Sequence, residues 1–253
     1  LRFTVNAETG ERIRAIAQRE NVTVHTVLFT VYSVLLYKLS GQDDFIVGSL
    51  VAGRSHPEVQ DMVGMFNNFL PIRCRLPEAQ TCGSWMQQLH RTLMEAYEHS
   101  EFPYDQIIAD TGASIDASRN PLFDTMLVVH SQMESPDTWR FGEWRCSRYE
   151  LELGQAKLDF KLDVYLAERG ELRCDLEFNT DLYARKTMER FVRHFQIAAE
   201  RLANDLDLLV TELDVLTAPE REQILFEFNS TFRLYPSEQT LVEQFERQAR
   251  LTP

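Results

Sequence analysis

LDFKLDVYLAERGELRCDLEF, residues 158–178, contains two runs in which apolar and polar side chains alternate. The apolar positions of the first run are Leu158, Phe160, Leu162, Val164 and Leu166, and those of the second are Leu172, Cys174, Leu176 and Phe178. Between the runs, Glu168, Arg169 and Gly170 are residues that suit a turn. Two alternating runs around a glycine-containing turn predict an antiparallel hairpin with one buried face.

The segments on either side of this hairpin alternate between helical and strand patterns. Apolar residues at helical spacing predict helices over residues 6–20, 23–40, 84–98 and 184–202. Apolar runs predict strands over residues 45–51, 69–76 and 125–129, the last of them central in a sheet. Between its capping residue Thr23 and Gly41, the second helix is apolar on most faces, so we expect it deep in the core. This mixture predicts an α+β layered sandwich.

Both ends of the chain differ from this pattern. From Pro219 onward a polar, glutamate-rich stretch contains Leu225, Phe226 and Phe228, which predicts an extended linker that ends in a short helix over residues 240–250. At the other end, Leu1–Asn6 has the pattern of a strand and carries neither a start methionine nor a signal peptide. We therefore expect a chain cut from a longer protein.

Composition excludes several classes of partner. The 253 residues carry a formal net charge of −13, which repels phosphate backbones and argues against nucleic acid. The apolar stretch Val22–Leu39 contains His25, Lys38 and several hydroxyl side chains, so it is too polar for a membrane span. Four scattered cysteines without a Cys-x-x-Cys pair predict reduced thiols in a cytoplasmic protein and no metal site.

General catalytic signatures are absent from the sequence. There is no P-loop, no G-x-G-x-x-G, no H-E-x-x-H and no G-x-S-x-G. The six histidines are isolated from one another, and His25 and His194 fall within predicted helices, where a core position is the ordinary interpretation. His130, at the end of the predicted central strand, is the best candidate for a site histidine. Without a family resemblance, the residues indicate only a soluble α+β domain.

Three segments of the sequence match known motifs. Residues 62–73, MVGMFNNFLPIR, are similar to I/V-G-x-F-V-N-T-L-P-L-R, and residues 99–105, HSEFPYD, are similar to H-Q-D-x-P-F-E. Residues 118–123 repeat S-R-N-P-L-F letter for letter. In order and spacing these segments resemble the condensation domains of nonribosomal peptide synthetases. Weaker matches to that family lie at residues 40–54, 156–160 and 177–183, so the resemblance covers about residues 1–217.

The chain departs from the family pattern in two places. Asn67 and Phe69 stand where the family has Val and Thr around Asn68, which leaves the donor or acceptor subtype open. The motif H-H-x-x-x-D-G, which carries the family's catalytic histidine in the N-terminal lobe, does not occur. The resemblance therefore implies the C-terminal lobe of a condensation domain over residues 1–217. Residues 218–253, with Tyr235-Pro236 and FERQARLTP at 245–253, resemble the linker and opening of an adenylation domain.

The resemblance also implies a fold, an activity and partners. The family is similar to chloramphenicol acetyltransferase, with two lobes and a tunnel between them. Donor and acceptor peptidyl carrier proteins bring aminoacyl thioesters to the tunnel on phosphopantetheine arms, and the domain itself binds no cofactor. We expect an acyltransferase-type amide synthase that works with its N-terminal lobe and a downstream adenylation domain, and a fragment that is inactive alone.

Five residues are candidates for the site. Asn120 is expected near the tunnel, because an amide can both donate and accept hydrogen bonds; the alternative is that it only caps the turn before Pro121. Arg119 is expected in a buried ion pair or in contacts with carbonyl groups. Gly64 and Asn68 are expected to line the tunnel, where glycine lets the backbone approach a pantetheine arm. His130 is the fifth candidate.

Two further functions stay open at the level of sequence. The chain is alternatively a non-catalytic module that docks carrier proteins, since docking does not need the missing histidine. It is alternatively a degenerate or epimerising relative, against which the intact S-R-N-P-L-F motif argues. The segment 131–157, with Trp139, Phe141 and Trp144, is long for a hairpin connection, and part of it is expected to cross to the N-terminal lobe. Without that lobe, its aromatic residues would form an exposed patch.

Overall fold

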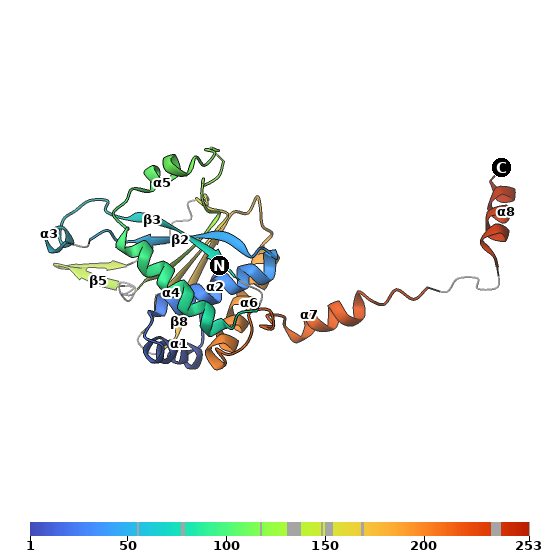
Figure 1. The fold of residues 1–253 in the computed structure, drawn as a ribbon, viewed down its shortest axis with the longest axis horizontal. Helices are drawn as coiled ribbons and strands as arrows, with labels where there is room; N and C mark the ends of the chain where they lie inside the picture. Colours follow the sequence, from blue (N-terminus) through green and yellow to red (C-terminus); the bar gives the residue numbers. More distant parts are fainter. Residues whose placement is uncertain are drawn as a thin grey trace. The chain divides into compact units, whose positions relative to one another are not determined.

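The hairpin predicted at residues 158–178 is part of the main sheet (Figure 1). In the computed structural model, β7 (Phe160–Leu166) and β8 (Leu172–Phe178) pair antiparallel, with Leu162 opposite Leu176. The structure describes residues 1–54, 56–76, 79–116, 118–130, 138–147, 149, 154–167, 170–233 and 239–252. The turn residues Glu168 and Arg169 lie outside that part of the chain. The predicted antiparallel pair is confirmed.

The sheet has six strands in the order β1-β8-β7-β4-β2-β3. The other four are β1 (Arg2–Val5), β2 (Asp44–Val51), β3 (Asn68–Arg75) and β4 (Thr125–His130). β4 runs parallel to both of its neighbours, β7 and β2, whereas the other pairs are antiparallel. The strand predicted at residues 125–129 is therefore central, as expected, in a mixed sheet of an α+β fold.

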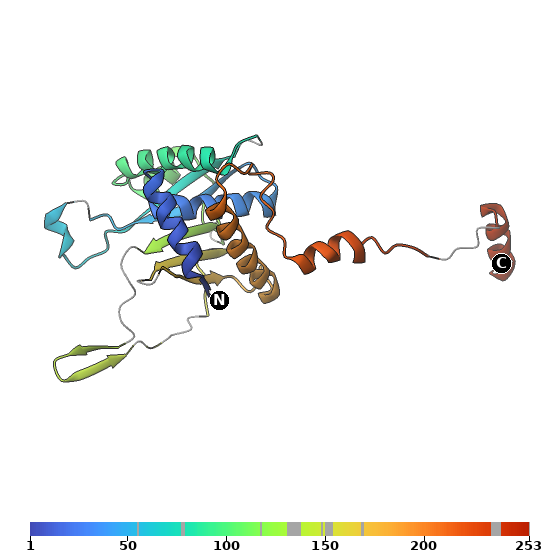
Figure 2. The ribbon, with the colours of Figure 1, turned by 90° about the horizontal axis from the view of Figure 1, so that it is seen from below.

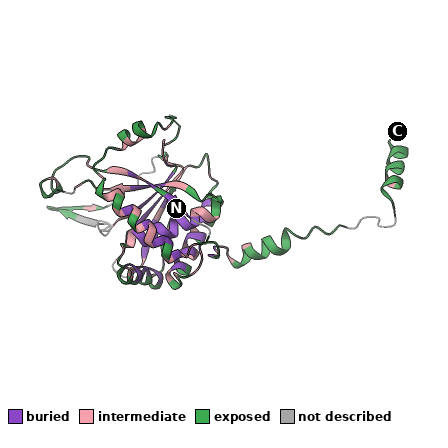
Figure 3. Ribbon diagram, viewed as in Figure 1, coloured by how far each residue is buried: buried purple, intermediate pink, exposed green. Residues whose placement is uncertain are grey.

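Four long helices cover one face of this sheet (Figure 2). They are α1 (Ala7–Arg19), α2 (Val24–Ser40), α4 (Cys82–Glu98) and α6 (Arg185–Asn204). α2 begins where the Thr23 hydroxyl accepts the Thr26 N–H and ends at Gly41, whose φ of 70° only glycine adopts without strain. Every residue from Thr26 to Leu35 is buried, because α2 packs against α1, α4 and α6 as well as the sheet (Figure 3). The prediction of a core helix is confirmed.

The opposite face of the sheet carries a second, smaller apolar cluster. Phe123, Met126 and Val128 are buried there, and Phe69 and Tyr104 are among the residues that pack against them. These strand residues alternate with positions that face the helices, as period-two geometry requires. The predicted hairpin places Leu158 on the same buried face as Phe160 and Leu162, and this detail is wrong. Leu158 packs in the second cluster, because the strand begins only at Phe160.

Three shorter elements were not predicted from the sequence. They are α3 (Pro57–Gln60), α5 (Tyr104–Thr111) and a separate hairpin of β5 (Thr138–Phe141) with β6 (Trp144–Ser147). The hairpin turns at Gly142, with φ at 60°. Phe141 and Trp144 are exposed, which agrees with the expected aromatic patch.

Residues Leu216–Pro253 form a second compact unit, separate from Leu1–Val215. The predicted extended linker is wrong for its first part: α7 (Ala218–Glu222) continues into a π-helical turn, η1 (Gln223–Glu227). The reason is a capping box, in which Thr217 and Glu220 bond each other's backbone N–H groups. The predicted terminal helix is α8 (Leu241–Leu251). Tyr235 and Pro236, which entered the adenylation-domain resemblance, lie outside the described residues.

The length and hydropathy of the helices bear on membrane insertion. Within the described part of the chain, no single helix is both long and apolar enough to cross a membrane. Only α1 and α2 taken together are long and apolar enough, and the chain bends by 113° between them.

A partly buried histidine, His25 in α2, predicts a specific acid sensitivity. Its ring nitrogens contact the Tyr97 hydroxyl at 3.0 Å and the Ser49 hydroxyl at 3.3 Å. Burial lowers the pKa of His25 to about 4. Below pH 6.5 the unfolded chain takes up a proton at this residue that the folded chain refuses, so stability falls as the pH falls toward 4. Between pH 7 and pH 5 this residue should remove about 2 kcal/mol from the free energy of unfolding.

Urea unfolding at the two pH values measures this loss. His25→Gln removes the titrating group, so that variant should lose about 2 kcal/mol less than the wild type between pH 7 and pH 5. His99, which is exposed, supplies the matched control: His99→Gln should keep the wild-type pH dependence. Equal pH dependence in all three proteins would contradict the prediction.

Candidate functional site

Asn68 joins two of the three motif segments at the start of the edge strand β3. It stands at the first position of β3, and its Nδ2 donates hydrogen bonds to the carbonyl oxygens of Ser100 (2.9 Å) and Phe102 (2.7 Å). Its Oδ1 accepts the N–H of Tyr104 at 3.3 Å, where α5 begins. Asn68 therefore holds the 99–105 segment at the edge of the sheet through three backbone groups of that segment, which is a positioning role.

Asn120 lies at the next step of the same network. Its Oδ1 accepts the Tyr104 hydroxyl at 2.5 Å and the backbone N–H groups of Leu122 (3.2 Å) and Phe123 (3.3 Å). The turn-capping contacts are thus real. Among the described residues, Asn120 Nδ2 has no acceptor within hydrogen-bonding distance. Because its oxygen is already occupied, only its N–H donors remain for a ligand, and a place of Asn120 near the tunnel stays a prediction.

Tyr104 holds this arrangement together. Its ring packs edge-on against Phe69 and at a tilt against Phe123, with both centroid distances at 5.7 Å. Desolvation raises the pKa of the Tyr104 hydroxyl, so the group stays protonated at neutral pH and remains a donor. Three segments that are separate in the sequence therefore meet through one aromatic side chain.

Arg119, beside Asn120, makes an ion pair, but not a buried one. Its guanidinium lies 2.9 Å from the Asp124 carboxylate and 3.9 Å from that of Asp159. The Arg119 side chain is 56% exposed, so the expectation of a buried pair is wrong. Exposed pairs contribute little to stability because water and salt screen them. This contact steadies the loop before β4 and gives no sign of direct chemistry.

Gly64 belongs to a loop that folds around the Arg54 guanidinium. Arg54 donates to the carbonyl oxygens of Gln60 (3.2 Å), Met62 (2.8 Å) and Gly64 (3.3 Å), and lies 4.5 Å from the centre of the Phe66 ring. A Cβ at Gly64 would lie 3.1 Å from Phe66 Cε2. The close approach that this glycine permits is therefore to its own neighbour Phe66. An approach to a pantetheine arm stays a prediction.

His130 is the last residue of β4, the strand that follows Asn120 in the chain. Its Nε2 is 3.0 Å from Asp163 Oδ1, and Lys161 Nζ is 2.8 Å from the other oxygen of the same carboxylate. The imidazole stacks on Tyr165 with a centroid distance of 4.3 Å. Burial alone would raise the pKa of Asp163, but the hydrogen bonds from His130 and Lys161 outweigh it and lower the pKa. Asp163 therefore stays ionised between two donors.

The structure does not bring His130 and Asn120 together. His130 is the last residue of β4, whereas Asn120 lies in the loop before that strand, and no hydrogen bond, ion pair or ring contact among the described residues joins the two side chains. Tyr104 and Asp163 were missed as site residues in the sequence. The only sequence signal was that Tyr104 stands where the family motif has Phe.

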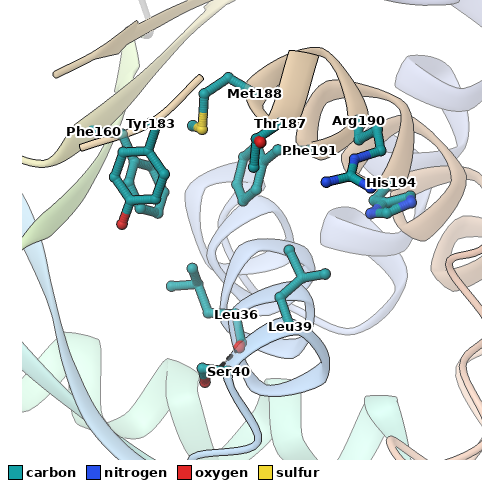
Figure 4. Close-up of a pocket in the computed structure, with 10 residues that line it drawn as sticks. All are labelled: Leu36, Leu39, Ser40, Phe160, Tyr183, Thr187, Met188, Arg190, Phe191 and His194. Atoms are coloured by element: carbon teal, nitrogen blue, oxygen red, sulfur yellow. Dashed lines mark hydrogen bonds between the residues drawn. The ribbon is translucent and has the colours of Figure 1, made fainter. Parts of the chain in front are cut away.

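A cavity of about 490 Å³ lies on the other side of the sheet, between α2 and α6 (Figure 4). Leu36, Leu39, Met188 and Phe191 make it largely apolar. None of the five predicted site residues lines it. A search of the described residues also finds no group of three or more His, Cys, Asp or Glu side chains that could hold a metal ion.

Comparison with known proteins agrees with the motifs. The family model named condensation domain matches residues 1–225. The chain therefore belongs to the condensation domain family of nonribosomal peptide synthetases.

Individual relatives are large synthetases. The chain is 34% identical over 249 residues to bacitracin synthase 1 of Bacillus licheniformis, a match that spans 98% of this chain and 5% of that protein. It is 35% identical over 251 residues to gramicidin S synthase 2 of Brevibacillus brevis, spanning 99% of this chain and 6% of that protein. The chain thus corresponds to a small part of each of these relatives.

Solved structures share the fold. A four-domain nonribosomal peptide synthetase, bound to AMP and glycine, has a TM-score of 0.81 at 21% identity, over 87% of this chain and 18% of that one. The first condensation domain of the calcium-dependent antibiotic synthetase, in complex with a substrate analogue, has a TM-score of 0.71 at 18% identity, over 86% and 46%. The chloramphenicol-acetyltransferase-like α+β fold predicted from the motifs is confirmed.

Proposed function

We propose that residues 1–217 act as the C-terminal lobe of a condensation domain that joins aminoacyl or peptidyl thioesters held on two carrier proteins. Residues 218–253 would then link this lobe to an adenylation domain and form its first helix. The family membership and the synthetases among the relatives support this proposal. The observation that carries it is the Asn68–Tyr104–Asn120 network, which gathers three family motifs and leaves the two Nδ2 donors of Asn120 without an acceptor among the described residues.

The chemistry asks for a polar donor at a developing oxyanion. The acceptor amine attacks the carbonyl carbon of the donor thioester, a C–N bond forms, the C–S bond breaks, and the pantetheine thiol leaves with a proton. Negative charge develops on the former carbonyl oxygen, where a fixed N–H donor is most effective. Asn120 Nδ2 is the group in this lobe suited to that oxygen or to an amide carbonyl of the pantetheine arm. A second lobe with the H-H-x-x-x-D-G motif would supply the histidine and the other wall of the tunnel.

Asn120→Ala in the intact synthetase tests this role. We expect condensation to slow by about 10- to 100-fold, the loss that follows when one positioning hydrogen bond worth about 1–3 kcal/mol is removed. The measurement is formation of the dipeptidyl thioester by mass spectrometry, with loaded donor and acceptor carrier proteins.

Asn179 offers a matched control for the structural part of the effect. Its Oδ1 also caps a turn, by accepting the Asp181 N–H at 2.9 Å, but it lies after β8. Asn179→Ala should lower the melting temperature and leave the condensation rate unchanged. If Asn120→Ala likewise lowers only the melting temperature, Asn120 caps its turn and does nothing more. Carrier binding by the wild type without any peptide-bond formation would favour the docking module instead.

A further inference from the structure

The Tyr104 hydroxyl makes the shortest of the three hydrogen bonds to Asn120. Its oxygen lies 2.5 Å from Asn120 Oδ1, whereas the backbone N–H groups of Leu122 and Phe123 lie 3.2 and 3.3 Å away. We propose that Tyr104 is a positioning residue for condensation, whose hydroxyl holds the Asn120 amide oxygen inward so that the two Nδ2 N–H donors face the thioester. This inference rests on the proposed function of Asn120 and deepens it.

The amide needs such a hold because its two ends are chemically opposite. If the Asn120 amide turned over, Nδ2 would face the two backbone N–H donors, and the Tyr104 hydroxyl would have to turn from donor to acceptor. The amide oxygen would then point to the ligand, where it could not stabilise a negative charge. The two backbone hydrogen bonds alone are long and come from adjacent residues of one turn, so the plane of the amide can still tilt. A third donor from a different segment of the chain fixes its plane.

Tyr104 is itself fixed by contacts that do not involve its hydroxyl. Its N–H is bonded to Asn68 Oδ1 at 3.3 Å, and its ring lies against Phe69 and Phe123. The hydroxyl also stays a donor at neutral pH, because burial raises its pKa. The variant Tyr104→Phe therefore keeps the ring, the backbone bond and the packing, and removes a single hydrogen bond. It also restores the Phe of the family motif.

A double-mutant cycle in the intact synthetase isolates this bond. The four proteins are the wild type, Tyr104→Phe, Asn120→Ala and the double variant, each assayed for dipeptidyl thioester under saturating loaded carriers. We expect Tyr104→Phe to lower kcat by about 3- to 10-fold, the factor that one ordinary hydrogen bond supplies. KM for the acceptor carrier and the melting temperature should stay at their wild-type values. In the Asn120→Ala background, Tyr104→Phe should have no further effect on kcat, because the Asn120 oxygen that accepts from the Tyr104 hydroxyl is gone.

Each other outcome overturns a distinct step. An unchanged kcat for Tyr104→Phe, with a slow Asn120→Ala, overturns the role of Tyr104 and leaves the proposed function standing. Equal losses from Tyr104→Phe in both backgrounds show that the hydroxyl does not act through Asn120, which also overturns the inference. If the wild-type synthetase forms no dipeptidyl thioester, the proposed function fails first, and the inference fails with it.

Discussion

The 253-residue chain alone, supplied with loaded donor and acceptor carrier proteins, should form no detectable dipeptidyl thioester. On the proposed function, one lobe provides one wall of the tunnel, so the amine and the thioester remain solvated and unoriented. Loss of this proximity costs about 7–11 kcal/mol of barrier, or about five to eight orders of magnitude in rate. The absent H-H-x-x-x-D-G motif adds to that loss. Mass spectrometry of the thioester products, compared with those of the intact synthetase, measures the difference.

A separate assay shows whether inactivity has the expected cause. Circular dichroism should report a folded chain with a cooperative thermal transition, since the core of residues 1–215 is closed by its own four helices. Turnover by the chain at a rate close to that of the synthetase would contradict the two-lobe argument. The chemistry would then have to come from this lobe, and the His130–Asp163 pair, 3.0 Å apart, would be the first group to test by His130→Ala.

The elements predicted well are those whose periodicity is long and whose ends carry strong signals. The hairpin alternates over two full strands, and α2 has Thr23 at one end and Gly41 at the other. The failures lie where such signals are weak. α5 begins after Pro103 with no side-chain cap, and the five residues of α7 show no apolar period, so their sequence predicts a linker.

The sequence predicts which residues belong to the candidate site, but not how they contact one another. Motif resemblance indicated Asn68 and Asn120, but their connection through Tyr104 spans segments up to 36 residues apart, which no local pattern reveals. The contact of His130 with Asp163 likewise depends on strand order. β4 pairs parallel to β7 in a register that sets His130 opposite Tyr165, and this brings Asp163 within reach. Register between distant strands is decided by the assembled core, and the separate segments do not contain it.

Trp85→Ala should produce the largest loss of stability of any single substitution considered for this lobe. The indole is 2% exposed in α4, and its Nε1 donates to the Ser33 hydroxyl of α2 at 2.9 Å. The variant leaves a large cavity between the two helices and removes a buried hydrogen bond. We expect the free energy of unfolding in urea to fall by about 3–5 kcal/mol. With a total stability of about 5–15 kcal/mol, a loss of that size also lowers the yield of folded protein.

Two variants separate packing from hydrogen bonding and from the general effect of losing a tryptophan. Trp85→Phe keeps most of the buried volume, and in this variant Ser33 still donates to the Thr30 carbonyl at 3.0 Å. The free energy of unfolding should therefore fall by only about 1–2 kcal/mol. Trp144, on the β5–β6 hairpin, is 76% exposed, and Trp144→Ala should change the free energy of unfolding by less than about 0.5 kcal/mol. If Trp85→Ala and Trp144→Ala lowered the free energy of unfolding equally, the contact between α2 and α4 would not be a main source of the core's stability. In that case burial of α2 would have to be stabilised mainly from the sheet and from α6.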